Sequence, residues 1–326
     1  GQDWSPSTSP DGDLVAFTSD RDGTSRIWLK QLANGSEAPL TTGPDESARF
    51  SPDGSQILFV RELGESRDLY RVPILGGSPR KLMSDVSSAD WSPDGSQVAF
   101  LRASNLERVN RYELGVADVQ TGAERILTHV DNRFVYGPRW SPDGEWIAIT
   151  ENALSGNLVA GGQLDLVNVG TGEIRNVDIT GLTGSYTAVD WAPDSRSFVV
   201  GRTQELLSHI TGRPGLCAQY YLDSGDIKPI FWTNFRVPQG GWGHSTIAVL
   251  DGGHVVMDRY ERNAILQEFP LEGGPPRTIT TSVGFDRQPV YSPDGRQVLF
   301  SSNRSGNIDL WTVDLVTGEL KQVTDD

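Results

Sequence analysis

The sequence predicts an all-β fold, arranged as a seven-bladed β-propeller of four-stranded antiparallel blades. Apolar segments are short and rich in Val, Ile and aromatic residues, and Asp-Gly or Asn-Gly turns separate them. The tetrapeptide Ser-Pro-Asp-Gly recurs along the chain at intervals close to the length of one propeller blade. These two observations predict a ring of repeated sheets rather than a sandwich or a barrel.

The repeat is counted from its turns. Ser-Pro-Asp-Gly stands at 9–12, 51–54, 92–95, 141–144 and 292–295, and weaker copies stand at 192–195 and 249–252. The seven turn aspartates are 42, 41, 49, 51, 57 and 43 residues apart. They are Asp11, Asp53, Asp94, Asp143, Asp194, Asp251 and Asp294. Repeats of roughly 40 to 50 residues with four strands each are typical of propeller blades.

Within a repeat we name the expected strands a to d, from the centre of the ring outwards. In the first repeat they are expected at 6–9, 14–17, 26–32 and 37–41. The last repeat has the same order around Tyr291, 298–300, Trp311 and 321–323. Pro presets φ and Gly accepts a positive φ in the turn between a and b. Because the aspartates recur at that turn in every repeat, we predict a structural role for them.

We predict that the repeats form one domain over residues 1–326. The expected blades are approximately 5–43, 44–85, 86–130, 131–181, 182–234, 235–281 and 282–326.

The repeats resemble a known family. An aromatic residue precedes the tetrapeptide at 50–54 and 91–95, and the segment 17–23 is followed by Ile27 and Trp28. This pattern resembles the bacterial WD40-like (PD40) repeats of the TolB propeller family and extends over essentially the whole chain. Propellers of this kind serve in TolB, beside peptidase domains, in lyases and as receptor modules. The resemblance therefore implies the fold more narrowly than the activity.

Composition excludes several classes of partner. The chain has 28 Lys and Arg against 43 Asp and Glu, a formal net charge of −15, which disfavours nucleic acid and anionic membranes. The single Cys217 excludes an intrachain disulfide, a CxxC pair and a thiolate zinc cluster. No apolar run approaches a membrane span, so no direct membrane insertion is expected. No cofactor is expected, and we expect a periplasmic or cell-surface location within a larger bacterial signalling or envelope protein.

One face of the ring carries the longer connections. The b–c and d–a connections are extended in the third to fifth repeats, whereas the opposite face is uniform. Variable loops on a rigid scaffold are the usual place for binding residues, so this face is predicted to bind a protein, a peptide or a small carboxylate-bearing ligand. The alternative is that these segments are loop extensions that the fold tolerates and that bind nothing. Their ranges are 103–111, 152–163, 203–216, 129–136, 181–187 and 233–244. Arg residues including Arg21, Arg61 and Arg304 are assigned to this face and bring it close to neutral charge.

The centre of the ring is predicted to be charged. Side chains alternate along strand a, so the residue before each inner aromatic faces the channel. Of the residues expected to face the channel, Arg49 and Arg139 could hold a carboxylate with paired hydrogen bonds. The alternative is an Arg and Asp ring that seals the channel. Together with the variable face, the candidate ligand-binding residues are Arg49, Asp90, Arg133, Tyr136, Arg139, Tyr186, Asp190, Arg213, Trp242, His244 and Arg287.

The motifs of several enzyme classes are missing from the sequence. Neither G-x-S-x-G nor H-E-x-x-H occurs, and no catalytic residue is assigned. The main expectation is therefore a non-catalytic binding propeller that serves as a sensor or scaffold. The alternative is a metal-assisted lyase or hydrolase of the propeller fold, with His129, His209 and His244 on the variable face as ligands.

Overall fold

A computed structural model describes residues 3–64, 66–106, 109–131, 133–155, 158–177, 185–203, 215–233, 247–250, 254–257, 265–270, 272, 275–281, 286–302, 304–305 and 308–325. In these ranges the regular elements are all β-strands, which confirms the all-β prediction. The same ranges contain no helix long and apolar enough to cross a membrane. The chain divides into two compact units, which are Gly1–Leu206, Gly215–Thr233 and Val237–Arg259 for unit 1, and Leu207–Pro214, Asn234–Arg236 and Tyr260–Asp326 for unit 2.

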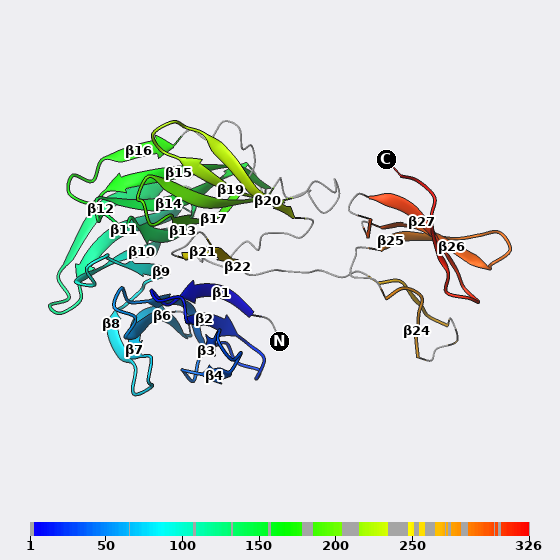
Figure 1. Cartoon of the computed structure of the whole chain (residues 1–326), viewed down its shortest axis with the longest axis horizontal. Coiled ribbons are helices and arrows are strands. Elements are labelled where there is room, and N and C mark those ends of the chain that lie inside the picture. Colours follow the sequence, from blue (N-terminus) through cyan, green and yellow to red (C-terminus); the bar gives the residue numbers. More distant parts are fainter. Residues whose placement is uncertain are drawn as a thin grey trace. The chain divides into compact units, whose positions relative to one another are not determined.

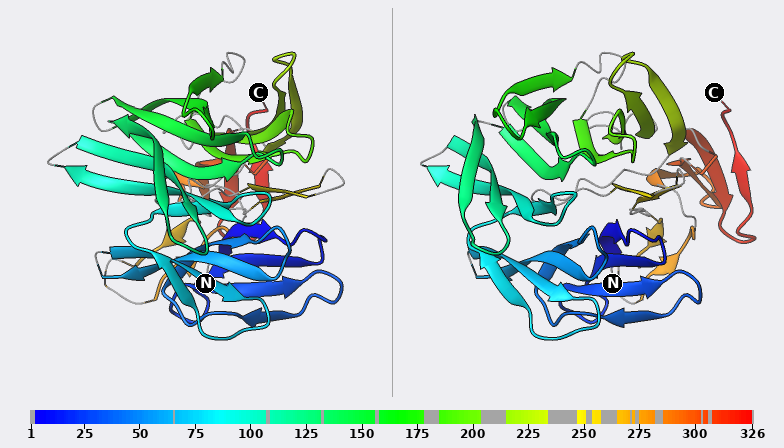
Figure 2. Two further views of the ribbon diagram at one scale, coloured as in Figure 1. Left: turned by 90° about the vertical axis from the view of Figure 1, so that its left-hand side faces the viewer. Right: turned by 60° about the vertical axis from the view of Figure 1, so that its left-hand side comes forward.

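Unit 1 contains five four-stranded antiparallel sheets and one hairpin, with strands paired in chain order (Figures 1 and 2). The strands of the first three sheets are β1 (Asp3–Thr8), β2 (Leu14–Ser19), β3 (Arg26–Gln31), β4 (Glu37–Pro39), β5 (Asp45–Phe50), β6 (Gln56–Leu63), β7 (Ser66–Pro73), β8 (Arg80–Met83), β9 (Ser88–Trp91), β10 (Gln97–Leu106), β11 (Val109–Asp118) and β12 (Glu124–Asp131). The remaining strands of unit 1 are β13 (Arg133–Trp140), β14 (Trp146–Ser155), β15 (Leu158–Asn168), β16 (Ile174–Val177), β17 (Ser185–Trp191), β18 (Ser197–Thr203), β19 (Gly215–Tyr221), β20 (Ile227–Thr233), β21 (Ile247–Leu250) and β22 (His254–Met257).

Unit 2 contains a hairpin and one further four-stranded sheet. Its strands are β23 (Gln267–Glu268), β24 (Arg277–Thr278), β25 (Arg287–Tyr291), β26 (Gln297–Ser302), β27 (Asp309–Asp314) and β28 (Leu320–Gln322). One face of the sheet buries Val298 and Phe300 against Leu266. The other face carries Val290 and Leu299, which are 61% and 36% exposed. This sheet therefore has an apolar face that its own unit does not cover.

The repeated turn is held by its serine and aspartate. In the first copy the Ser9 hydroxyl donates to Asp11 Oδ1 at 2.5 Å, and the Asp13 amide donates to the same oxygen at 3.1 Å. These bonds stabilise the charged carboxylate, so they hold the pKa of Asp11 below its usual value. Gly12 has φ of 76°, which only glycine adopts without strain. The turn aspartates therefore complete hydrogen bonds of the turn itself.

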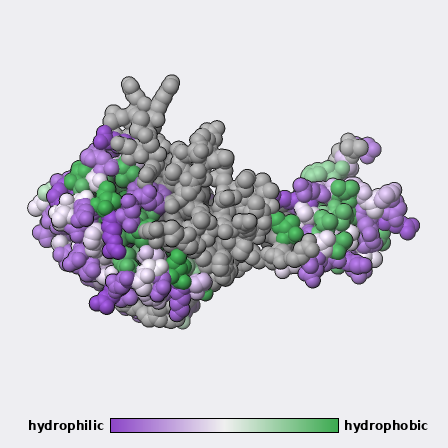
Figure 3. Space-filling model, turned by 90° about the horizontal axis from the view of Figure 1, so that it is seen from above, coloured by the Kyte–Doolittle hydropathy of each residue, from purple (hydrophilic) through white to green (hydrophobic). Residues whose placement is uncertain are grey.

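The hydrophobic core lies between neighbouring sheets of unit 1. Leu58 and Val60 of β6 pack against Trp91 of β9 and Phe100 of β10, and these side chains are at most 6% exposed. Equivalent clusters join the next sheets along the chain. On the face shown in Figure 3, hydrophilic side chains separate the apolar patches of the described surface. The apolar residues of each strand thus serve sheet-to-sheet packing, as the repeat predicts.

The innermost strand of several sheets contains a bulge. The register with the second strand shifts between Trp4 and Ser7, and the same shift occurs in β5, β13, β17 and β25. Ser5 and Ser47 lie in two of these bulges with φ of 53° and 62°, a region that costs a non-glycine residue free energy. A bulge redirects side chains at a sheet edge. Four of these bulges lie on the inner strands of unit 1, close to Arg49, Arg139 and Asp190, and the fifth lies on β25 of unit 2.

Two of the predicted insertions extend strands. The range 103–111 continues the β10–β11 ladder, in which Ala103 pairs with Tyr112 and Leu106 pairs with Val109. Similarly, 152–163 extends the β14–β15 hairpin. The longer b–c connections expected in these two ranges are thus built, in their described residues, by extra strand pairing, which satisfies the added backbone N–H and C=O groups. The extensions therefore project as ordered hairpins (Figure 2).

Gly115 of β11 lies against the ring of Phe100 on β10. A Cβ atom at Gly115 would lie 2.5 Å from Phe100 Cζ and 3.1 Å from the Arg125 carbonyl oxygen. Because Phe100 is fully buried, Gly115→Ala is expected to lower the free energy of unfolding by about 2 kcal/mol, measured by urea denaturation. Gly170→Ala is the control, since its Cβ would meet no atom closer than 3.4 Å. Equal losses in the two variants would contradict the proposed clash.

Candidate functional site

Four charged residues lie together at the inner strands of unit 1. Arg49, Asp90, Arg139 and Asp190 come from β5, β9, β13 and β17, which are the first strands of successive sheets. Arg49 and Arg139 line one small cavity and are 8% and 2% exposed. Arg139 Nε lies 3.9 Å from Asp190 Oδ1. The alternation of side chains along the inner strands thus brings these four candidate residues into one cluster.

Side-chain acceptors on alternate inner strands accept hydrogen bonds from backbone amides on the inner strand of the next sheet. Asp90 Oδ2 accepts the Trp140 amide at 2.9 Å, and Asp190 Oδ2 accepts the Val249 amide at 2.9 Å. Ser7 has the equivalent place on β1. Between these positions, the indoles of Trp91 and Trp191 donate to the carbonyl oxygens of Arg49 and Arg139 at 3.3 and 3.0 Å. The two aspartates therefore connect neighbouring sheets as well as facing the arginines.

Burial changes the charge of this cluster. Loss of hydration raises the pKa of Asp90 to about 7, against the opposing effect of the nearby Arg49. Burial also raises the pKa of Asp190. In both carboxyl groups, burial therefore favours the protonated form over the charged one.

The cavity between the arginines is small. It has a volume of about 10 Å³ and is lined by Ser5, Ser47, Ala48, Arg49, Ser88, Ala89 and Arg139. A volume of this size holds about one water molecule. A carboxylate group would enter it only if the lining side chains moved.

The other candidate residues are more scattered. Tyr136 lies half-buried on β13, and Arg287 lies half-buried on β25 in unit 2. Arg133 is the first residue of β13, and Tyr186 is the second residue of β17. The side chains of both lie outside the described part. Arg213, Trp242 and His244 are outside the described residues altogether.

The candidate metal ligands are only partly described. His129 is exposed on β12, with its Nε2 atom 3.6 Å from Glu113 Oε1. His209 and His244 lie outside the described residues. Among the residues that are described, no three His, Cys, Asp or Glu side chains gather around one point. Burial raises the pKa of the Cys217 thiol to about 12, so this thiol is not a nucleophile at neutral pH.

Three arginines assigned to the variable face have structural partners. Arg61 forms two hydrogen bonds with the buried Asp45 and stacks over Phe59. Arg304 bonds both oxygens of Asp286 in unit 2. Arg21 has the same arrangement, with Asp3 and Glu37 as partners and Trp28 beneath the guanidinium. These charges are therefore already compensated within the protein.

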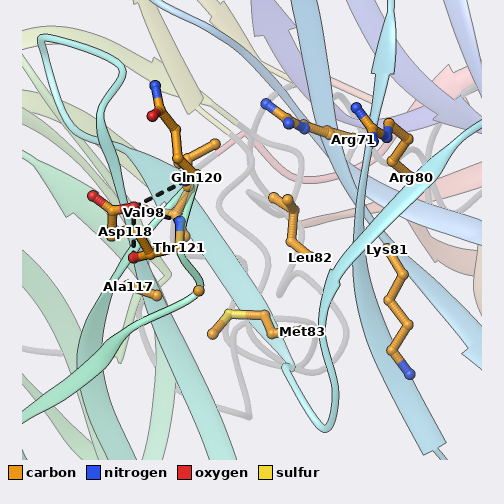
Figure 4. A pocket seen from close by; sticks show the side chains of 12 residues that line it. Arg71, Arg80, Lys81, Leu82, Met83, Val98, Ala117, Asp118, Gln120 and Thr121 are labelled. Atoms are coloured by element: carbon orange, nitrogen blue, oxygen red, sulfur yellow. Dashed lines mark hydrogen bonds between the residues drawn. The ribbon is translucent and has the colours of Figure 1, made fainter.

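A groove on the outer edge of the second and third sheets was not predicted (Figure 4). It has a volume of about 280 Å³, with Arg71, Arg80 and Lys81 on one wall and Asp118 on the other. Arg71 and Arg80 are direct cross-strand partners on β7 and β8, whereas Lys81 pairs with Asp68 at 2.6 Å. The sequence signal for this groove was the presence of Arg71 and Arg80 near the expected c and d strands of the second repeat. Positive charge on an outer strand also discourages edge-to-edge association.

The sheets, their central polar cluster and their repeated turns define a β-propeller protein. A family model described as the TolB beta propeller domain matches residues 1–133. Over residues 1–133 the repeats therefore match the TolB-like propeller family that the sequence resembles.

Sequence relatives include both unassigned and enzymatic proteins. Uncharacterized protein Atu1656 of Agrobacterium fabrum is 25% identical over 220 residues, covering 66% of this chain and 66% of that protein. Uncharacterized peptidase YuxL of Bacillus subtilis is 26% identical over 151 residues, covering 45% of this chain. Tol-Pal system protein TolB of Anaeromyxobacter dehalogenans is 36% identical over 84 residues, or 25% of this chain. The matched segments span only 21% and 19% of the last two relatives.

Solved structures share the fold at low sequence identity. A putative TolB from Agrobacterium tumefaciens has a TM-score of 0.61 at 18% identity, with 79% of this chain and 90% of that chain covered. An oligogalacturonate lyase in complex with manganese has a TM-score of 0.55 at 17% identity, with 97% and 90% covered. A puromycin hydrolase has a TM-score of 0.55 at 17% identity, with 100% of this chain and 54% of that chain covered.

These findings correct the expected function. The sequence led us to expect a non-catalytic sensor or scaffold, because no hydrolase motif is present. The peptidase relative and the hydrolase and lyase neighbours contradict that expectation and favour the enzymatic alternative. The expectation was wrong because the absence of a catalytic motif from a propeller sequence does not exclude an enzyme whose catalytic residues lie outside that propeller.

Proposed function

We propose that this chain is the propeller of an amide-hydrolysing enzyme. The match to the peptidase YuxL carries the proposal, because it is a relationship in sequence, at 26% identity over 151 residues. The matched segment is 21% of YuxL, and this chain corresponds to 54% of the puromycin hydrolase chain. Both proportions are consistent with a propeller that forms one part of a larger hydrolase.

The proposal places the hydrolytic groups outside these 326 residues. The sequence has no G-x-S-x-G, and the buried Cys217 is held as a neutral thiol. The role of the propeller is then to hold or select the substrate. The long β10–β11 and β14–β15 hairpins and the candidate residues of the variable face are the proposed contacts for a peptide substrate, including its carboxylate.

The complete native protein is expected to hydrolyse aminoacyl and peptidyl anilides, measured by release of the coloured aniline. Variants with a shortened β10–β11 hairpin should change the ratio of kcat/KM for long and short peptides while leaving the smallest anilide unaffected. Shortening the β3–β4 turn, which lies at the outer edge of the first sheet, is the control. Absence of amide hydrolysis with every substrate would overturn the proposal.

A metal-assisted lyase is the second candidate. It is supported by the manganese complex of oligogalacturonate lyase, whose chain has nearly the same extent as this one. The described residues supply His129 and Glu113 but no set of three ligands, so we derive no step through a metal. Manganese binding by calorimetry and formation of an unsaturated uronate, followed by ultraviolet absorbance, test this candidate. Failure of both assays would reject it.

The ring is proposed to have seven blades within one domain over residues 1–326. In the described residues 28 strands follow one another, and β21 to β24 supply the four strands expected for the sixth repeat. The uncovered apolar face around Val290 and Leu299 supports this count, because a blade in a ring buries both faces. We also propose an extracytoplasmic location, which fits the TolB relative.

A further inference from the structure

The small cavity at the centre of unit 1 has unsatisfied hydrogen-bond donors. Among the described residues, Ser5 Oγ and Arg139 Nε are buried and lack any hydrogen-bond partner. Ser5 is 3% exposed and Arg139 is 2% exposed. Leaving such groups unpaired in the interior costs on the order of 1 to 3 kcal/mol each. Both residues line the same cavity, so one occupant could satisfy both groups.

The charges around the cavity favour an anion. Its lining includes two arginines and three serines, and no acidic side chain among the described residues that form it. Arg139 donates through Nη1 to the Pro138 carbonyl oxygen at 2.7 Å, which leaves its Nε atom available. Arg49 makes no side-chain hydrogen bond or ion pair with the described residues, although its charge acts on Asp90 and Asp190. The lining therefore offers a surplus of donors and positive charge.

The nearby carboxyl groups do not fully neutralise these arginines. Asp190 Oδ1 lies 3.9 Å from Arg139 Nε, which is beyond hydrogen-bond distance. The second oxygens of Asp90 and Asp190 accept backbone amides of β13 and β21. Burial raises the pKa of both groups, to about 7 for Asp90, and so disfavours the negative charge that would oppose an anion.

The backbone is shaped to place hydroxyl groups at the cavity. Ser5 and Ser47 occupy the β1 and β5 bulges with positive φ, although neither is glycine. Strain of this kind persists where the surrounding structure supports it, and it concentrates at ligand sites. Ser88 adds a third serine from β9 and is 3% exposed. The cavity is thus built by the inner strands of four successive sheets.

From this geometry we infer that the cavity binds one monatomic anion of chloride size, held by Arg49, Arg139 and the surrounding serine hydroxyls. The volume of about 10 Å³ selects a single atom over a carboxylate, phosphate or sulfate. A water molecule would fit by size, but it must also donate two hydrogens, and the lining is richest in donors. The bound anion would stabilise unit 1 by joining four sheets, independently of the proposed enzymatic role.

The test compares thermal unfolding in sodium chloride, sodium bromide and sodium gluconate at equal ionic strength. Chloride and bromide should raise the midpoint in a saturable manner, by about 5 °C at a concentration roughly 100-fold above the dissociation constant. Gluconate, which is too large for the cavity, should give no saturable rise. Crystals grown in bromide should show anomalous density between Arg49 and Arg139.

Variants locate the effect. Arg139→Met should abolish the halide dependence of the unfolding midpoint. If that variant does not fold, the double variant Ser5→Ala and Ser88→Val takes its place, because it removes two hydroxyls and fills the cavity. Arg102→Met is the control because it removes an arginine that pairs with Glu124 outside the cavity, and it should retain the full halide shift. Density for a water in bromide crystals, or an unchanged halide shift in the serine double variant, would overturn the inference.

Discussion

Asp45→Ala is expected to lower the free energy of unfolding by about 3 to 5 kcal/mol, because it leaves a largely buried arginine without its carboxylate. Asp45 is fully buried, and its two oxygens accept Arg61 Nε at 2.6 Å and Arg61 Nη2 at 2.9 Å. The Gly43 amide donates to the same carboxylate at 2.9 Å. The substitution thus removes three hydrogen bonds at once.

Arg61 cannot easily escape to water after this change. Its guanidinium lies 5.4 Å from the ring centroid of Phe59 and 5.0 Å from that of Tyr70. These rings are parts of the packed β6 and β7 strands, so the charge stays near them. We expect the full loss to appear in guanidinium chloride denaturation followed by tryptophan fluorescence.

Asp22→Ala is the matched control for Asp45→Ala. Asp22 is 46% exposed and lies 3.8 Å from Arg26 Nη1, so its removal should cost at most about 1 kcal/mol. A loss in Asp45→Ala no greater than in Asp22→Ala would show that burial does not decide the strength of these pairs. Asp286→Ala should repeat the large effect in unit 2, where the carboxylate is buried against Arg304.

The second large effect concerns pH. The pKa of Asp90 in the folded protein is about 7, above its value of 3.8 when fully hydrated. The folded state therefore holds the proton more tightly than the unfolded state. The stability that protonated Asp90 contributes is complete below about pH 4 and is lost as pH rises through 7. The native protein should be more stable at pH 5 than at pH 8 through this group.

Asp90→Asn should remove that part of the pH dependence. The amide oxygen can still accept the Trp140 amide, and the neutral side chain avoids the cost of burying a charge. Three pKa units correspond to about 4 kcal/mol as an upper limit, and we expect about 2 kcal/mol because Asp90 is partly exposed. The measured quantity is the difference in unfolding free energy between pH 5 and pH 8.

Asp223→Asn provides the comparison for Asp90→Asn. Asp223 is exposed in the turn after β19, so its replacement should leave the pH profile as in the native chain. If Asp90→Asn also retains the native pH profile, then burial of Asp90 does not contribute to it.

Much of the local structure could be predicted from the residues. The Ser9 and Asp11 turn depends on groups within a few positions, so each copy of the tetrapeptide forms the same hydrogen bonds. The alternation along strand a predicted that Arg49 and Asp190 share one side of the inner strands, and in unit 1 Arg49 lines the small cavity while Asp190 lies 3.9 Å from Arg139. The strand pairing of the inserted ranges near 103 and 152 was not predicted, because it extends a hairpin, and sequence length alone does not reveal pairing.

The candidate site was less predictable because it depends on residues that are far apart in the chain. Arg61 was assigned to a binding face, yet Asp45 and the ring of Phe59 occupy it. The outer groove beside Arg71 forms only where two sheets meet. Neither feature leaves a periodic pattern, so neither could be found by counting turns and spacings.

By itself, the sequence determined the repeated turns, the β-strands and the side of each inner strand that faces the centre, because these follow from short-range geometry and a two-residue period. Only the tertiary structure decided which charges meet and how much water they retain. The pKa of Asp90, the unpaired Arg139 Nε and the size of the cavity all depend on the approach of separate sheets. Hydration and distance between sheets set those energies, and neither is encoded in any single repeat.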